Sequence, residues 1–308
     1  MPFFSSFTGS FSGGRRTVAG GGGGGGIGGA SGSPDIGTSI FANSFDTATQ
    51  ATEPKDLWFN NDGTKVFVAD NSSNTIYRYG LTTGWDVSTA SYDSVSYSFS
   101  GSTTALNGLT FNADGTSFYI MGNDQGGTTP DSIFQFDMAS AYDIANASLA
   151  GSGDTGDSGN LAVDSTPQKL MFNNDGTKLY IVGSANDTIY QYSLSSAYDI
   201  TTISYDSVSF QIRTQTNNPR GMKFGHDGTK LYVIDSEGTS PVALDVYTLS
   251  SAYDINTLSY DSTVAINASG IIRPEGLYLH PDGTSFYVQD GHATFATAEI
   301  YQYNTDAL

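Results

Sequence analysis

The sequence predicts an all-β fold, a five-bladed β-propeller, and three observations lead to this prediction. A phrase of twelve residues, first seen as FNNDGTKVFVAD from Phe59 to Asp70, returns in similar form to give five copies. No segment has a sustained apolar period of 3.6 residues, which argues against helices. Repeats of about 50 residues that lack helices are typical of propeller blades. The turn aspartates of the five copies are separated by 52, 61, 52 and 55 residues and are Asp62, Asp114, Asp175, Asp227 and Asp282.

Each repeat is expected to form four short strands, as its third copy illustrates. The segment QKLMFN is the first strand, NDGT is a turn, and KLYIVG is the second strand. IYQYSL is the third strand, and SVSFQIRT is the fourth. Aromatic and branched residues favour strands, and Asp-Gly between two such runs is a strong hairpin signal. The repeat therefore predicts an antiparallel four-stranded blade.

The two ends of the chain predict that the ring closes. The fifth repeat stops at EIYQYNTDAL, after its third strand, and the segment Thr38–Leu57 aligns with Val208–Met222 of an earlier repeat. We therefore expect a strand from Thr38 to Asp46 to complete the last blade beside the three strands that follow Glu275. Closure removes exposed sheet edges. An open solenoid is the alternative, and it would need polar caps at both ends.

Residues 1–37 are predicted to be a separate N-terminal arm, and residues 38–308 the propeller. The arm holds 14 of the 37 glycines, including the run Gly20–Gly26, which favours a flexible tether. Four phenylalanines lie near its start. One hypothesis is that they dock the arm on another protein or on a second copy of the chain; the other is a disordered terminus. The anchor residues are Phe3, Phe4, Phe7 and Phe11.

Composition excludes several classes of function. The chain has 12 Lys and Arg against 31 Asp and Glu, which gives a net charge of −19. Such a charge repels nucleic acid and anionic membranes. There is no cysteine, so thiol chemistry is absent, and no stretch approaches the ~20 apolar residues of a membrane span. The start of the chain lacks the continuous apolar core of a secretory signal. We expect neither nucleic acid as a partner nor membrane insertion.

One face of the ring is predicted to be scaffold. The Asp-Gly turns keep one length in all repeats, and so do the connectors between third and fourth strands, such as SAYDITTISYDS. Connector tyrosines are expected to pack between blades, and the aspartates near them to cap backbone amides. The tyrosines are Tyr142, Tyr198 and Tyr253, and the aspartates are Asp86, Asp143, Asp199 and Asp254.

The opposite face is predicted to bind the ligand. Its loops between second and third strands differ in length among the repeats, as binding loops on a constant scaffold do, although neutral loop drift is the alternative. Candidates in these loops are Asp124, Glu237 and His292. The blade-to-blade crossings enter the innermost strands on the same face, at equivalent positions that vary in side chain. These positions are Lys55, Asn107, Gln168, Arg220 and Glu275.

No catalytic, metal or cofactor site is predicted. The chain has no HExxH, GxSxG or phosphate-loop motif, and its three histidines lack metal-ligand spacing. Asp154 and Asp157 lie in an insertion before the outer strand of the second repeat, which is expected to be a solvated acidic loop. We therefore expect a protein that is not an enzyme.

The repeat DGTKLYIVGSANDTIYQYSLSSAYDITTISYDSVSF resembles propeller repeats of marine bacteriophage structural proteins and of some marine bacterial surface proteins. The shared features are the DGTK strand, the YQY strand and the connector that ends in Asp and Ile or Val. The resemblance implies a virion protein, either a tail-fibre or spike-like receptor binder or a decoration protein, located on the virion and held by its arm. A lectin-like glycan-binding module at a cell surface, or outside the cell, is the first alternative. A propeller glycoside hydrolase or lactonase is the second.

Overall fold

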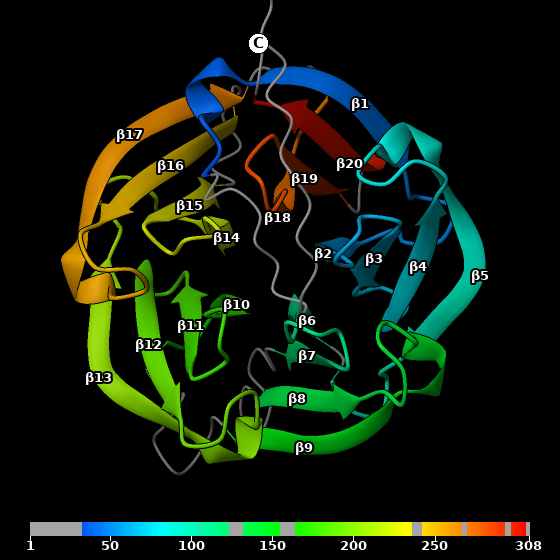
Figure 1. Ribbon diagram of the computed structural model, residues 1–308, viewed down its shortest axis with the longest axis horizontal. Helices are drawn as coiled ribbons and strands as arrows, with labels where there is room; N and C mark the ends of the chain where they lie inside the picture. The colour runs from blue at the N-terminus through cyan, green and yellow to red at the C-terminus, as the bar shows by residue number, and fades with distance from the viewer. Residues whose placement is uncertain are drawn as a thin grey trace, which may run out of the picture.

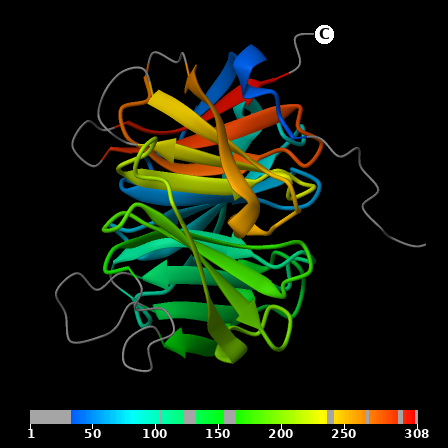
Figure 2. The same ribbon diagram turned by 90° about the vertical axis from the view of Figure 1, so that its left-hand side faces the viewer.

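The computed structural model describes residues 33–103, 105–122, 132–154, 164–235, 242–266, 270–292 and 297–305. In this part of the chain, five four-stranded antiparallel sheets surround a central axis, which confirms the predicted five-bladed propeller (Figure 1). Seen from the side, the strands run roughly along the ring axis, so the connections between them gather on two opposite faces (Figure 2). No helix among the described residues is long and apolar enough to cross a membrane.

Each blade is a meander whose first strand lies nearest the axis. Blade 1 consists of β2 (Pro54–Phe59), β3 (Lys65–Asp70), β4 (Thr75–Leu81) and β5 (Ala90–Ser98). Blade 2 consists of β6 (Leu106–Phe111), β7 (Ser117–Gly122), β8 (Ser132–Asp137) and β9 (Ser148–Asp154). Blade 3 consists of β10 (Pro167–Phe172), β11 (Lys178–Gly183), β12 (Thr188–Leu194) and β13 (Ile203–Gln211). Blade 4 consists of β14 (Pro219–Phe224), β15 (Lys230–Asp235), β16 (Val242–Leu249) and β17 (Leu258–Ile266). Blade 5 consists of β18 (Pro274–Leu279), β19 (Ser285–His292), β20 (Thr297–Asn304) and β1 (Ile40–Asp46).

The fifth blade closes the ring as predicted. Its outer strand β1 pairs antiparallel with β20, from Ile40 opposite Asn304 to Asp46 opposite Glu299. Figure 1 shows the blue β1 lying beside the red β20, so the first and last strands of the described chain belong to one sheet. The expected closure by a strand within Thr38–Asp46 is therefore confirmed.

The ring begins before the predicted boundary at Thr38. Ile36 is 3% exposed and packs in a core cluster that spans blades 4 and 5. The Tyr232 hydroxyl donates to the Pro34 carbonyl at 2.9 Å, and the Thr38 hydroxyl donates to the Thr305 carbonyl at 2.7 Å. A carboxylate oxygen of Asp35 accepts from the Gly37 amide at 3.1 Å. Residues 33–39 are thus part of the propeller body and not of the arm.

These residues have a clear counterpart in the other blades. A three-residue 3₁₀ turn precedes the outer strand of every blade, and the sequence PDIGT at 34–38 occupies the place of YDITT at 198–202. The fifth repeat is therefore divided between the two ends of the sequence at a point before this connector, so the connector stands at the N-terminal side together with β1. The five turns in the described chain are η1 (Ile36–Thr38), η2 (Val87–Thr89), η3 (Ile144–Asn146), η4 (Ile200–Thr202) and η5 (Ile255–Thr257).

The connector tyrosines and aspartates have the scaffold roles that were predicted, with one exception. Tyr198 has a φ of 61°, and its hydroxyl donates to the Asn174 carbonyl at 2.7 Å. Tyr142 reaches the neighbouring blade, where its hydroxyl donates to Asn61 at 2.9 Å. The cap prediction is wrong for Asp143, which accepts from the Asn146 side chain and not from a backbone amide. The caps are present at Asp86, Asp199 and Asp254.

Each Asp-Gly turn is fixed by its aspartate and by the connector aromatic that covers its glycine. In blade 3, the Asp175 carboxylate accepts from the Thr177 hydroxyl at 2.5 Å and from its amide at 2.9 Å. These bonds lower the pKa of Asp175. Gly176 has a φ of +71°, and a Cβ placed there would lie 2.3 Å from the Tyr198 ring. Only glycine satisfies both the backbone angle and the ring contact.

Replacing Gly176 by alanine is expected to destabilise the fold by about 2–4 kcal/mol. The left-handed backbone costs an L-residue about 1–2 kcal/mol, and displacement of the Tyr198 ring adds an overpacking cost. Urea unfolding of the variant measures the change. Gly101→Ala is the matched control, because a Cβ placed there has no described atom within 4 Å and the φ of Gly101 lies outside the left-handed region. Equal stabilities of the two variants would contradict this account of the turn.

Candidate functional site at the turn end of the central channel

The innermost strands carry the side chains that line the central axis. In every blade the second residue of this strand is bulged, because the register of pairing shifts around it. A bulge re-aims the side chain it carries. The bulged residues are the five predicted ligand-face positions, Lys55, Asn107, Gln168, Arg220 and Glu275. These residues lie at the end of the central channel where the blade-to-blade crossings enter, which we call the loop end. The opposite end, beside the Asp-Gly turns, is the turn end.

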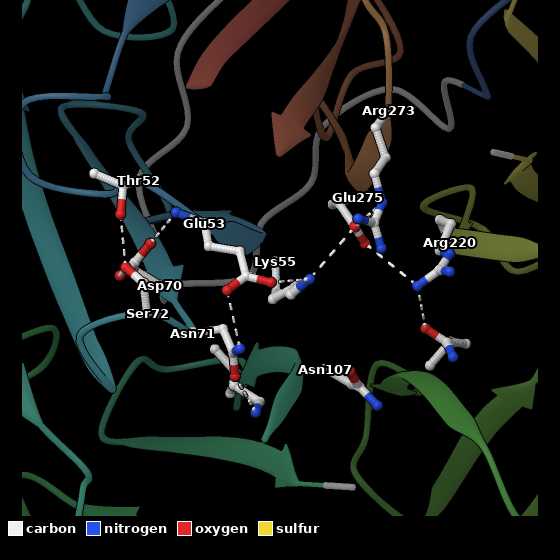
Figure 3. A network of polar contacts seen from close by, with 12 residues as sticks. Thr52, Glu53, Lys55, Asp70, Asn71, Ser72, Asn107, Arg220, Arg273 and Glu275 are labelled. Atoms are coloured by element: carbon white, nitrogen blue, oxygen red, sulfur yellow. Dashed lines mark hydrogen bonds and ion pairs between the residues drawn. The ribbon is translucent and has the colours of Figure 1, made fainter. Parts of the chain in front are cut away.

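At the loop end, four of the five predicted residues join a polar network around a buried carboxylate (Figure 3). Glu275 is 1% exposed and contacts three cations: Arg273 at 2.7 Å, Lys55 at 3.5 Å and Arg220 at 3.8 Å. A guanidinium nitrogen of Arg220 also donates to the Gln168 side chain at 3.1 Å. The structure thus brings four of the five predicted residues together around one carboxylate.

The remaining loop-end predictions are placed differently. The Asn107 side-chain amide donates to the Pro167 carbonyl at 2.7 Å, which fixes blade 2 against blade 3. Asp124, Glu237 and the side chain of His292 lie outside the described part of the chain, as do Phe3, Phe4, Phe7 and Phe11 of the arm. Ligand binding at the loop end stays a prediction. The ion pairs described there join the charged groups of the network to one another.

Two charged groups of opposite sign fill the middle of the channel. The Asp56 carboxylate accepts from the Leu57 and Leu109 amides, both at 3.0 Å. Burial raises the pKa of Asp56, and Lys169 opposes this rise. The Lys169 ammonium donates to the carbonyls of Lys55, at 2.7 Å, and of Asn107. Burial lowers the pKa of Lys169 to about 8. These groups separate the loop end from the turn end.

The turn end holds a cavity of about 290 Å³, which we call the turn-end cavity. Its walls come from every blade: the fifth residue of each innermost strand, residues of the Asp-Gly turns, and aromatic residues of the connectors. The inner-strand residues are Trp58, Thr110, Met171, Lys223 and Tyr278, and the outer residues include Asn61, Asn174, His226, His280, Trp85, Tyr198 and Tyr253.

Sequence reasoning assigned this end to scaffold and missed the cavity. The turns and connectors are indeed uniform in length, but a signal was present in the inner strands. Their fourth residue is Leu or Met and their sixth is Phe or Leu in all repeats, whereas the fifth is Trp, Thr, Met, Lys or Tyr. Variation in side chain at one position of a constant strand, and not variation in loop length, marks this cavity.

Lys223 is the cation of the cavity. Its ammonium lies 3.4 Å from the centre of the Trp58 ring and 4.7 Å from that of Tyr278. Burial lowers the pKa of Lys223 to about 7, against the opposing charge of Asp56. Among the described residues, no carboxylate forms an ion pair with this ammonium. The faces of the Trp58 and Tyr278 rings supply part of the stabilisation that a carboxylate would give this ammonium, through cation–π contacts.

A histidine and an aspartate also lie at the rim of the cavity. The Nδ1 atom of His280 contacts the Asp282 carboxylate and accepts from the Asp282 amide at 3.2 Å. Burial lowers the pKa of His280, against the effect of Asp282. The Asp282 carboxylate accepts from the Thr284 hydroxyl at 2.6 Å, as the turn aspartates of the other blades do from their threonines. The Asp282 carboxylate therefore stabilises its own Asp-Gly turn, as the equivalent aspartates do in the other blades.

The described side chains contain no group of three or more His, Asp or Glu residues placed to hold a metal ion. The candidate site is therefore a cavity with aromatic walls, one ammonium group, and amides and imidazoles at its rim. Such a site can hold a small organic molecule through ring contacts and a few polar bonds.

Several solved structures are similar to this chain at TM-scores below 0.5. No protein-family model and no curated protein matches the chain. A structure of a functionally unknown protein from Desulfotomaculum acetoxidans aligns with a TM-score of 0.47 and 10% identity, over 80% of this chain and 68% of that one. A candidate 6-phosphogluconolactonase from Bacteroides uniformis aligns with a TM-score of 0.45 and 17% identity, over 75% and 62%. The β-propeller domain of a Myceliophteria thermophila protein aligns with a TM-score of 0.47 and 10% identity, over 87% and 100%. With TM-scores below 0.5 and identities of 10–17%, these likenesses carry no conclusion about the chain, whose propeller fold is established by its own five sheets.

Proposed function

We propose that this chain is a non-enzymatic binding protein, that its ligand site is the turn-end cavity, and that the ligand is a saccharide of a host surface. The observation that carries the proposal is the make-up of the cavity. Rings of Trp85, Tyr198 and Tyr253 line it beside the polar turn residues Asn61 and Asn174. Tyrosine and tryptophan present an apolar ring with a polar edge, which suits a sugar ring with its C–H face and hydroxyl rim.

The absence of catalysis is part of the proposal. A hydrolase would need a poised nucleophile or an acid–base pair. The one His–carboxylate contact recorded among the described cavity residues joins His280 to Asp282, whose carboxylate is held by Thr284 in a turn repeated in all blades. A screen of lactones, esters and glycosides tests this point. Turnover that disappears in a His280→Gln variant would overturn it.

We further propose that the propeller is a virion component, a receptor binder or decoration protein, held by residues 1–32 through its phenylalanines to another virion protein or to a second copy of the chain. The support is the resemblance of the repeats and the location of the ring contacts, which begin near Ser33. A chain that starts at Ser33 should fold and yet be missing from purified particles analysed by mass spectrometry. Normal incorporation of this shortened chain would contradict the anchor.

A matched pair of substitutions tests which end of the channel binds. Asn174 at the turn end and Asn107 at the loop end each donate a side-chain amide to a carbonyl of the next blade, at 2.9 and 2.7 Å. We expect Asn174→Trp to narrow the turn-end cavity and to weaken saccharide binding at least about tenfold, a change of about 1.4 kcal/mol. Asn107→Trp should leave binding unchanged. Isothermal titration with a panel of host-surface saccharides measures both.

The reverse result would place the ligand at the loop end, as the sequence predicted, and would refute the turn-end assignment. Folding of both variants is checked by circular dichroism, so that a loss of binding is not confused with a loss of structure.

A further inference from the structure

Cations of this acidic protein are concentrated around the channel. The chain has a net charge of −19 and only 12 Lys and Arg residues. Five of these belong to the channel network or line its cavity, and the acids of the same set are Glu53, Asp56, Glu275 and Asp282. The five cations are Lys55, Lys169, Arg220, Lys223 and Arg273. An anionic ligand would therefore meet attraction inside the ring that the outer surface does not offer.

Lys223 differs in its partners from four other lysines of the chain, which are Lys55, Lys169, Lys178 and Lys230. Lys55 pairs with Glu53 and Glu275, Lys178 pairs with Asp206, and Lys230 pairs with Asp261. Lys169 donates to two carbonyl oxygens. The Lys223 ammonium instead faces the Trp58 and Tyr278 rings at the floor of the cavity. A buried charge without an opposite partner is costly, so this position favours a ligand that supplies one.

The charged groups around Lys223 leave room for that partner. From β2, Asp56 exerts the main opposing charge, but its carboxylate is held by the Leu57 and Leu109 amides. The charge of Lys169, on β10, acts on Asp56, and Tyr278 of β18 contributes its ring. At the rim, His226 lies on the turn after β14, and His280, whose pKa is lowered by burial, contacts Asp282. Asp282 is half exposed, where solvent screens its charge.

We propose that the turn-end cavity selects acidic saccharides, with the sugar carboxylate bound to the Lys223 ammonium and the sugar ring against the connector aromatics. This inference rests on the proposed function and names the ligand class of the same site. A carboxylate–ammonium bond in a partly desolvated site favours the acid over its neutral counterpart by about 10- to 100-fold in affinity.

Binding of an acid at this place is linked to protonation of Lys223. The free amine titrates at about pH 7 because burial lowers its pKa. A bound carboxylate raises that pKa, so the complex holds the proton that the free protein loses. Affinity is therefore constant below pH 7 and falls as the pH rises above it, by up to tenfold per unit until the pKa of the complex is reached. A neutral saccharide has no such dependence on Lys223.

Isothermal titration with four probes tests the inference: N-acetylneuraminic acid and glucuronic acid against N-acetylglucosamine and glucose. The wild-type protein should prefer the acids at least about tenfold at pH 6, and the preference should shrink between pH 7 and pH 9. Lys223→Met should reduce the ratio of acid to neutral affinity to near one. Lys230→Met removes a surface lysine paired with Asp261 at 3.2 Å and should leave the ratio unchanged.

The outcomes separate the two proposals. Binding of neutral and acidic sugars with equal affinity, or a preference that survives Lys223→Met, overturns the acid selectivity while the binding function stands. Binding of none of the four by the wild type counts against the saccharide function itself, and the acid selectivity falls with it. If Lys223→Met does not fold, the pH dependence of the wild type decides, since a flat acid affinity from pH 6 to pH 9 contradicts a role for this amine.

Discussion

A chain that lacks residues 33–46 is expected to lose a cooperatively folded ring. The deletion removes the connector η1 and the outer strand β1, and with them the buried Ile36 and the ladder from Ile40–Asn304 to Asp46–Glu299. Burial of an isoleucine contributes about 1.5–3 kcal/mol, and each ladder hydrogen bond about 0.5–1.5 kcal/mol. The summed loss is roughly 5 kcal/mol or more, which is comparable with the whole stability of a typical domain.

Thermal unfolding followed by circular dichroism, together with size-exclusion chromatography, measures this effect. The exposed edge of β20 should also make the shortened chain associate. Deletion of residues 1–32 is the control, and it should leave the melting temperature unchanged. A synthetic peptide of residues 33–46 should restore cooperative unfolding when added, because it can pair with β20 as the native strand does. An unaltered melting temperature in the 33–46 deletion would contradict closure by this segment.

Glu275→Ala is expected to destabilise the ring by about 3–5 kcal/mol. Its carboxylate is 1% exposed and is the common partner of Lys55, Arg220 and Arg273, so its removal takes one shared counter-charge from cations of two blades and one crossing, while Lys55 stays paired with Glu53 (Figure 3). Breaking a buried ion pair from one side costs this much because the remaining charge stays desolvated.

Urea unfolding compares Glu275→Ala with a surface control. Asp93→Ala removes the partner of Arg78, a pair at 2.7 Å whose side chains are 29% and 17% exposed, and it should cost no more than about 1 kcal/mol. If both substitutions cost the same small amount, the loop-end network does not hold the blades together, and those residues become available for the ligand role that the sequence predicted.

The fold was predictable because the sequence repeats its local signals. Five Asp-Gly turns, each followed by a threonine, specify the hairpins, and the unequal ends of the chain specify the closure of blade 5. The boundary predicted at Thr38 leaves out residues that contact the ring, because the fifth connector differs in sequence from the other four. Pro34 replaces the connector aromatic and Gly37 replaces a threonine, so PDIGT does not look like YDITT until both are seen before an outer strand.

The candidate site was less predictable than the fold. The five bulged positions at the loop end were identified, but nothing in the sequence says that Glu275 is shared by three cations. The turn-end cavity was missed because Lys223, Trp58 and Tyr278 come from blades 4, 1 and 5 and meet only when the ring closes. Distances across the axis are a property of the closed ring, whereas sequence spacing reports only contacts within a blade.

The central claim is that the turn-end cavity is the ligand site, and the two tryptophans of the chain test it directly. Trp58 and Trp85 both line this cavity, and no other tryptophan exists in the sequence. The protein labelled with 5-fluorotryptophan should give two ¹⁹F resonances, and both should shift during titration with a saccharide whose binding is established by calorimetry. Saturable binding heat with both resonances unmoved would place the ligand elsewhere on the propeller and contradict the account.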